Sequence, residues 1–182
     1  MPEKEPGISN KEMLLKKELS IEDIIGDYRL FLQAIFENLS QAEIGNDEFS
    51  ELDHICYRVE TKERYEQKKQ ELLRVCEQYS EAPFNGRLIS VIKLKTPLGF
   101  NDIQIRSIEL IAPKENNRFK EGLEHAEFVI KDTLEQFLEK HKGLPFNFSA
   151  YGREINRELI LEFEGCALKF HSQSLMSVRG ME

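Results

Sequence analysis

Two short stretches decide the fold: EHAEFVI at residues 124–130 and DHICYRV at residues 53–59. Each opens with an acidic residue and a histidine, and each continues with a run of about five residues that is typical of a β-strand. The two histidines, His54 and His125, lie 71 residues apart. We therefore predict an internal duplication, in which two equivalent strands each begin one structural module.

The segments that follow each stretch repeat the same order of elements. Helical spacing of apolar residues predicts helices, and short apolar runs between turn residues predict strands. The order is strand, helix, then two or three strands, and the offset suits one βαβββ unit. Helices are expected at residues 61–79 and 133–140, and further strands at 88–94, 103–112, 158–163 and 167–171, with the strand at 88–94 broken at Pro97.

The predicted organisation has four parts within one compact domain. Residues 1–10 form a flexible arm, residues 11–45 a helical extension, residues 46–116 the first module and residues 117–182 the second. Apolar positions recur at helical spacing up to residue 39, which predicts one helix or two that meet near the N-cap candidate Ser20.

Composition excludes several classes of protein. The chain has 182 residues, 40% hydrophobic and 32% charged, with a net charge of -8. An acidic chain is unsuited to neutralising phosphates, and no apolar run approaches the roughly 20 residues that span a bilayer. Three widely spaced cysteines suggest neither a disulfide framework nor a metal knuckle. We expect a cytoplasmic protein with no nucleic-acid or membrane partner.

Four residues are candidate metal ligands: His54, Glu109, His125 and His171. The histidines begin or end predicted strands, and Glu109 lies inside the apolar strand 103–112, where a charge is costly unless it is paired or binds a metal. Paired modules would bring the two first strands and the two last strands together, with Glu109 equivalent to His171. Three imidazoles and one carboxylate suit Zn, Fe, Mn, Ni or Co. A single strand histidine, however, is more often a packed or surface residue than a ligand.

Alternation along the strands adds neighbours to this candidate site. Glu127 shares a face with His125 and is a candidate general base. Arg58 and Lys169 share faces with His54 and His171, and Arg87 lies in a turn; these three are candidate substrate-binding residues. Pairing among these charges, or a place at the solvent-exposed rim, is the alternative for each of them.

Five motifs resemble the YecM family, a branch of the vicinal oxygen chelate superfamily of glyoxalase-like and dioxygenase-like proteins. The motifs are DHI at 53–55, NGR at 85–87, IEL at 108–110, EGLEH at 121–125 and LKFH at 168–171. The resemblance implies an α+β fold in which two βαβββ modules form an incomplete barrel around a divalent metal ion. It also implies that His54, Glu109, His125 and His171 are the ligands, because each matches a family position.

The resemblance does not fix a reaction, because one fold supports many activities. A metal-dependent isomerase, lyase or oxygenase acting on a small oxygen-bearing substrate is the first hypothesis, with the metal as Lewis acid. A non-catalytic protein that sequesters a small molecule or a metal is the second, and an interaction module built on residues 11–39 is the third. Two modules in one chain can complete the site, so a monomer suffices and a homodimer stays open.

Overall fold

The computed structural model describes residues 19–115 and 120–181. The predicted arm, the first part of the helical extension and the module boundary at 116/117 lie outside the described residues. The elements are α2 (Ile21–Ile25), α3 (Tyr28–Gln41), a 3-10 turn (Asn46–Glu48), β1 (Phe49–Arg58), α4 (Lys62–Leu73), β2 (Cys76–Phe84), β3 (Arg87–Phe100), β4 (Ile103–Ile111), β5 (Gly122–Ile130), α5 (Leu134–Lys140), β6 (Leu159–Phe163), β7 (Cys166–His171) and α6 (Leu175–Val178).

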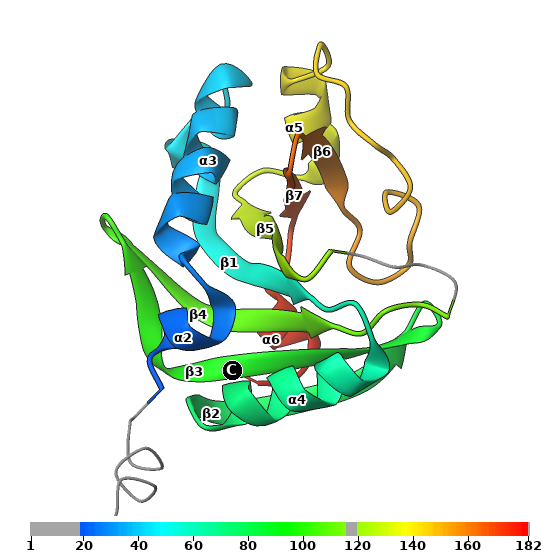
Figure 1. Cartoon of the computed structure of the whole chain (residues 1–182). Helices are drawn as coiled ribbons and strands as arrows, with labels where there is room; N and C mark the ends of the chain where they lie inside the picture. The colour runs from blue at the N-terminus through cyan, green and yellow to red at the C-terminus, as the bar shows by residue number, and fades with distance from the viewer. Residues whose placement is uncertain (1–18, 116–119, 182) are drawn as a thin grey trace, which may run out of the picture.

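All seven strands form one open sheet in the order β2-β3-β4-β1-β5-β7-β6. The two first strands, β1 and β5, are antiparallel neighbours at its centre, and each also pairs in parallel with the last strand of its own module, β4 or β7. This arrangement is approximately two-fold symmetric about the β1–β5 junction (Figure 1). The α+β class, the paired modules and the unclosed sheet are therefore confirmed.

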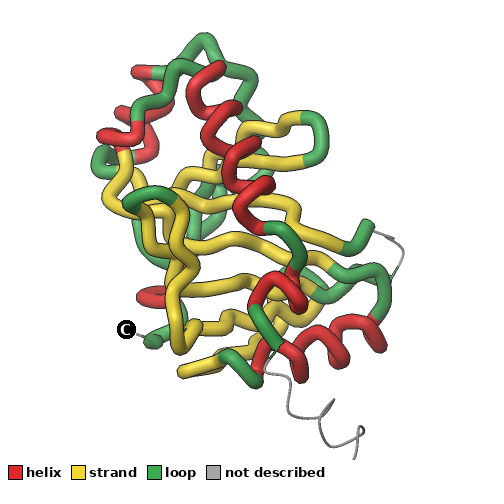
Figure 2. Tube along the Cα trace, turned by 60° about the vertical axis from the view of Figure 1, so that its left-hand side comes forward, coloured by secondary structure: helices red, strands yellow, loops and turns green. Residues whose placement is uncertain are grey.

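The two faces of the sheet have different chemistry. One face carries Ile55, Ile108, Phe128 and Phe170, which join the main hydrophobic core beneath α2, α3, α4 and α5. Strand alternation sends His54, Glu109, His125 and Glu127 to the opposite face, where they are buried as well. The short helix α6 lies on that second side, across the strands from α4 (Figure 2). The sheet therefore separates an apolar core from a polar buried layer.

The predicted helix at 61–79 is too long. It ends at Leu73, and residues from Cys76 onward form β2, which pairs with β3 from Cys76↔Leu94 to Phe84↔Arg87. Because β2 is an edge strand with mostly exposed side chains, it lacks the apolar alternation that marks a strand. Its edge position also accommodates Pro83, which cannot donate to a ladder.

Two further predictions about strands need correction. Pro97 does not end the strand at 88–94, because β3 continues to Phe100. Pro97 lies within the register shift between Lys93 and Leu98, where the pairing with β4 is interrupted, so the missing N–H of proline is tolerated. The second module has the two strands that were expected after its helix, and it lacks the third strand of a full βαβββ unit. A single bridge between Asn147 and Ile160 occupies the place on β6 that β2 occupies on β3.

The helical extension contains a break that was not predicted, in addition to the helix start at Ser20. Ser20 is the N-cap of α2, as expected, but the described helices meet at Gly26 and Asp27. Gly26 has a φ of 83°, a conformation that strongly favours glycine, and the Asp27 side chain caps α3 by accepting from the Leu30 N–H at 3.0 Å. Across the described part of the chain, every helix is too short or too polar to traverse a lipid bilayer.

A carboxylate network fastens α4 to the β2–β3 hairpin. Glu81 Oε2 accepts from the Tyr65 hydroxyl at 2.7 Å, the Lys69 ammonium at 2.9 Å and the Ser90 hydroxyl at 3.1 Å. Burial alone would raise the pKa of Glu81, but Lys69 and Tyr65 outweigh it and hold that pKa at about 2. The charged form of Glu81 is therefore more stable in the folded state than in the unfolded chain.

Replacing Glu81 by glutamine is expected to lower the free energy of unfolding at pH 7 by about 1–2 kcal/mol, after allowance for solvent screening. The depressed pKa stabilises the fold above the unfolded value of 4.5, and this contribution is lost as the pH falls towards 2. Urea unfolding at pH 7 and pH 3 checks this. The difference in free energy of unfolding between the wild type and Glu81→Gln should be smaller at pH 3 than at pH 7. A difference that does not change with pH would contradict this prediction.

Candidate metal centre

Two β-bulges aim the central histidines. Between Leu52↔Phe128 and His54↔Glu127, strand β1 has one extra residue, Asp53; between Cys56↔His125 and Tyr57↔Leu123, strand β5 has one extra residue, Glu124. A bulge redirects side chains locally, so each acidic residue can lie beside the histidine that follows it instead of on the opposite face. In both modules, therefore, the bulge allows the acidic side chain to contact the histidine that follows it.

Four side chains from three adjacent strands converge next to these bulges. His54 on β1, Glu109 on β4, and His125 and Glu127 on β5 each place one ligand atom within 4.8 Å of the other three, and all four residues are buried. His125 Nε2 lies 3.0 Å from Glu127 Oε1 and 3.4 Å from Glu109 Oε2. His54 Nε2 lies 3.6 Å and 3.9 Å from the same two oxygens.

Five buried polar atoms on the candidate ligands and His171 have no hydrogen-bond partner among the described residues. They are the Nε2 atoms of His54, His125 and His171 and the Oε2 atoms of Glu109 and Glu127. Such atoms are costly unless they bind something. Two carboxylate oxygens and three imidazole nitrogens are the donor set that a divalent transition metal takes, so the residues present fit the metal that the sequence implies.

His171 lies at the edge of the group. Its Nε2 atom is 3.8 Å from Glu127 Oε2 and 3.5 Å from Asp53 Oδ2, and its ring centroid is 6.3 Å from that of His54. The structure thus brings together three of the four residues expected as ligands, substitutes Glu127 for His171 in the tight group, and leaves His171 next to it.

The histidine rings are oriented through their other nitrogen. His54 Nδ1 contacts Asp53 Oδ2 at 2.8 Å, His125 Nδ1 contacts Glu124 Oε2, and His171 Nδ1 contacts Asn156 Oδ1 at 3.1 Å. Because an ionised carboxylate only accepts, Nδ1 of His54 and His125 donates to it, and Nε2 is the nitrogen that faces the group. Burial alone would lower the pKa of His54, but Glu127 and Asp53 outweigh it and raise that pKa to about 10, so a metal ion would replace the Nε2 proton. A carboxylate behind a ligand histidine is a common feature of protein metal sites.

Asp53 also ties this arrangement to α6. Its Oδ2 atom accepts from the Leu175 N–H at 2.8 Å in addition to His54. Replacing Asp53 by asparagine keeps its size but removes the charge that holds the ring of His54. We expect divalent-metal affinity to fall about 10- to 100-fold with little change in metal stoichiometry, checked by competition against a fluorescent chelator. An unchanged affinity would show that Asp53 does not orient a ligand.

Glu127 forms a buried ion pair with Lys169. Lys169 Nζ on β7 donates to Glu127 Oε1 at 2.7 Å and lies 3.5 Å from Glu158 Oε2. Burial alone would raise the pKa of Glu127, but Lys169 and His54 outweigh it and hold that pKa well below its usual range. A carboxylate stabilised in its charged form is a weak proton acceptor. These contacts suit a metal ligand better than the general base expected from the sequence.

The three basic residues expected to bind substrate have different surroundings. Lys169 is paired as described, and Arg58 Nη2 lies 3.2 Å from Glu124 Oε2, so both contribute to the charge balance of the site. Arg87 lies at the start of β3, where burial and the repulsion of Arg58 lower its pKa. Of the three, Arg87 and Lys169 line the cavity beside the candidate ligands.

The proposed equivalence of Glu109 and His171 is wrong by two residues. Glu109 pairs with Cys56, and the residue that corresponds to Cys56 in the second module is Glu127, which pairs with Lys169. Lys169 therefore takes the symmetric position of Glu109, and His171 lies one alternation further along β7, opposite Val129. The pair of equivalent positions thus carries opposite charges.

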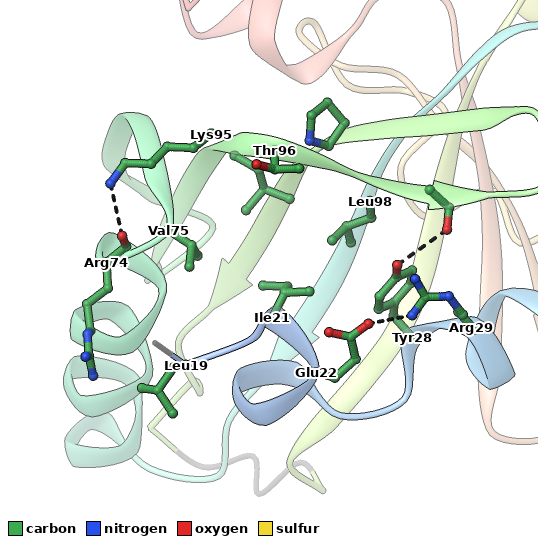
Figure 3. A pocket seen from close by; sticks show the side chains of 13 residues that line it. Leu19, Ile21, Glu22, Tyr28, Arg29, Arg74, Val75, Lys95, Thr96 and Leu98 are labelled. Carbon is green, nitrogen blue, oxygen red and sulfur yellow. Dashed lines mark hydrogen bonds and ion pairs between the residues drawn. The ribbon is translucent and has the colours of Figure 1, made fainter. Parts of the chain in front are cut away.

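A cavity of about 260 Å³ adjoins the candidate ligands, and both Glu109 and Glu127 line it. A larger cavity of about 660 Å³ lies elsewhere, between α2, the end of α4 and β3, with walls that include Tyr28, Val75 and Leu98 (Figure 3). Its charged side chains include the Arg29–Glu22 ion pair at 2.5 Å, and none of the described residues that line it is a histidine or a cysteine. We therefore assign the chemistry to the smaller cavity.

Two residues near the site, Glu158 and Asn156, could not be singled out from the sequence. Glu158 is buried, lines the smaller cavity, and accepts from Arg153 and Asn156 at 3.0 Å each. Burial and the neighbouring Glu127 raise its pKa. Asn156, which orients His171, has a φ of 51°, and both residues precede β6 in a polar loop where no periodicity marks them. The remaining histidine, His141, lies away from the site and contacts Glu48 at 2.8 Å.

Two solved structures are similar to this chain. A solved structure titled "Structural Genomics, Protein EC4020" is similar with a TM-score of 0.72 and 26% identity, covering 89% of this chain and 92% of that one. A second, from Bacillus subtilis subsp. subtilis str. 168 and provisionally titled a dioxygenase, has a TM-score of 0.46 and 8% identity, covering 70% and 42%. None of the curated proteins compared matches the chain.

The family match covers helices α2 to α5 and all four residues of the tight group. The sequence model described as "YecM protein" matches residues 20–156, which is more than half of the chain and includes His54, Glu109, His125 and Glu127. The match begins at the N-cap of α2, earlier than the motifs quoted from the sequence, and it ends before His171. The chain belongs to the YecM family.

Proposed function

We propose that this chain binds one divalent transition-metal ion through His54, Glu109, His125 and Glu127, with His171 as an additional nearby donor. The observation that carries the proposal is the convergence of five buried polar atoms without hydrogen-bond partners among the described residues. Burial removes the water that otherwise solvates these side chains, and the Lys169 ammonium pairs with only one of the two carboxylates, Glu127. A bound cation compensates both carboxylates and all Nε2 lone pairs.

We further propose that the protein is a metal-dependent enzyme of the vicinal oxygen chelate superfamily, of the isomerase, lyase or oxygenase type. A metal held here supplies Lewis-acid chemistry to a small substrate that offers two neighbouring oxygens. The contribution of the chain is to hold the ligands, to keep Glu127 ionised through Lys169, and to shield the centre from water. All these residues come from one chain, so a monomer is sufficient, and a homodimer or a cytoplasmic location stays a prediction.

A non-catalytic binding protein is the second candidate, and one observation favours it. Each carboxylate that lines the smaller cavity already has a role: Glu127 pairs with Lys169, Glu158 accepts from Arg153 and Asn156, and Glu109 is a proposed metal ligand. A ready proton acceptor is therefore lacking among the described lining residues. A protein that binds a small molecule on its metal without turnover would need none.

Elemental analysis of protein purified without chelators tests the proposal, together with thermal unfolding in the presence of Zn, Mn, Fe, Ni or Co. We expect one metal ion per chain and a rise in the unfolding temperature with at least one of these ions, because a ligand of the folded state stabilises it. A protein that contains no metal and does not respond to any of these ions would refute it. Turnover assays on the metal-loaded protein then separate the two candidates.

A further inference from the structure

A second group of candidate metal ligands surrounds His125. Cys56 on β1 and Glu124 and His125 on β5 each place one ligand atom within 4.8 Å of the other two. Cys56 pairs directly with His125 across the two strands, and Glu124 is the extra residue of the bulge that follows this pair. The bulge therefore brings a carboxylate next to a thiol and an imidazole.

The two groups use opposite nitrogens of the His125 ring. Nε2 lies 3.0 Å from Glu127 Oε1 and 3.4 Å from Glu109 Oε2, whereas Nδ1 contacts Glu124 Oε2. A neutral imidazole has one lone pair, on whichever nitrogen carries no proton. A metal ion on Nδ1 therefore leaves the proton on Nε2, where it can be donated to Glu127, and withdraws His125 from the first group.

Cys56 gives the second group a chemistry that the first group lacks. Among the described residues, it is the one cysteine of the three that belongs to such a group. Burial raises the pKa of its thiol to about 11, so the thiol keeps its proton at pH 7 until an ion displaces it. Thiolate ligands select soft ions such as Zn²⁺ or Cu⁺, whereas carboxylates suit harder ions such as Mn²⁺. The two groups therefore differ in the ions that they favour.

A separate cavity gives access to the second group. It has a volume of about 650 Å³ and is lined by Glu124, whereas Glu109 and Glu127 line the smaller cavity. The Glu124 side chain is 32% exposed, while Cys56 and His125 are fully buried. An ion can therefore reach the Glu124 carboxylate from solvent without passing the first group.

The neighbouring charge of Arg58 restricts which ions this group can hold. Its Nη2 atom lies 3.2 Å from Glu124 Oε2, so an ion that binds Glu124 shares the carboxylate with a guanidinium. Like charges so close together repel, and the repulsion is strong where water is excluded. The bonds to the Cys56 thiolate and to the imidazole must outweigh this repulsion, and soft ions form such bonds more strongly than hard ones.

We propose that Cys56, Glu124 and His125 form a second metal site, which takes a thiophilic ion and excludes an ion from the first group by using the same imidazole. The protein then holds one ion per chain, and the kind of ion decides which group is filled. This site goes beyond the proposed function, because its three ligands would bind a soft ion whether or not the first group binds a hard one.

Cadmium titration of the full-length protein tests the second site. The protein is stripped of metal and kept reduced, and the ultraviolet charge-transfer absorption of a cadmium–thiolate bond is followed. We expect one Cd²⁺ per chain with this absorption, and Cys56→Ala should abolish it. Cys166→Ala is the matched control, because it removes a half-buried thiol that contacts Asn38 and belongs to no such group among the described residues. It should keep the full absorption.

Competition with Mn²⁺ tests the shared imidazole. At 100 times its dissociation constant, Cd²⁺ should lower the apparent affinity of the wild-type protein for Mn²⁺ about 100-fold, as expected when two ligands exclude each other. Cys56→Ala should bind Mn²⁺ as the wild type does and lose most of this competition. Glu124→Gln, which changes a partly exposed side chain, should weaken Cd²⁺ binding about 10-fold and keep the absorption at saturation.

Wild-type protein without cadmium–thiolate absorption, or absorption that survives in Cys56→Ala, overturns the second site. Absorption that depends on Cys56 but has no effect on Mn²⁺ binding overturns the exclusion. If Cys56→Ala does not fold, an unchanged cadmium affinity in Glu124→Gln overturns the site. Protein that shows the absorption but takes up none of the ions tested for the first group refutes the proposed function alone, so the two proposals fail separately.

Discussion

Replacing His125 by alanine is expected to lower the affinity for a divalent metal ion by at least about 100-fold, because an imidazole at the centre of the candidate group is lost. His125 Nε2 is 3.0 Å from Glu127 and 3.4 Å from Glu109, so it is the imidazole nearest to both carboxylates. Its side chain is fully buried among the other candidate ligands. Elemental analysis and metal titration of the purified variant measure the effect.

His141→Ala is the matched control for this prediction. It deletes the same side chain from the end of α5, where the ring contacts Glu48 and Phe137. We expect it to keep one metal ion per chain at wild-type affinity. His171→Ala should have an intermediate effect, because its Nε2 atom lies 3.8 Å from Glu127 and outside the tight group. A His125→Ala variant with wild-type metal content would show that the ion binds elsewhere.

Much of the site could be predicted from the sequence because strand alternation is a local property. Once His54 and His125 were assigned to equivalent strands, alternation placed Glu127 on the same face as His125, and the structure has this arrangement. The acidic residue before each histidine was visible in the sequence as well. Its use as a bulge residue that orients the ring required the pairing of β1 with β5.

The errors arose where a conclusion depended on long-range pairing. The register of β7 against β5 decides that Lys169, and not His171, corresponds to Glu109, and a parallel pair of strands far apart in sequence leaves no local sign of its register. The edge strand β2 and the walls of the smaller cavity were likewise missed, since hairpin, loop and α6 meet only through the tertiary fold.

Replacing Phe170 by alanine is expected to lower the free energy of unfolding by about 3–5 kcal/mol, the range for a large aromatic side chain removed from a packed core. Phe170 is fully buried on β7, and its ring centroid lies 4.9 Å from that of Phe137 and 5.9 Å from that of Phe49. Urea denaturation measures the loss. Phe148→Ala is the control, because this ring is 51% exposed and its removal should cost about 1 kcal/mol or less.

The same variant tests whether the two faces of the sheet act independently. Phe170 points into the apolar core, while its neighbours Lys169 and His171 face the candidate metal group. A metal ion at 100 times its dissociation constant should stabilise wild type and Phe170→Ala equally, by about 2.7 kcal/mol, if the core substitution leaves the ligands in place. The destabilisation would then be the same with and without metal. A loss of metal affinity in Phe170→Ala would instead show that core packing sets the position of β7, and with it the position of Lys169 against Glu127.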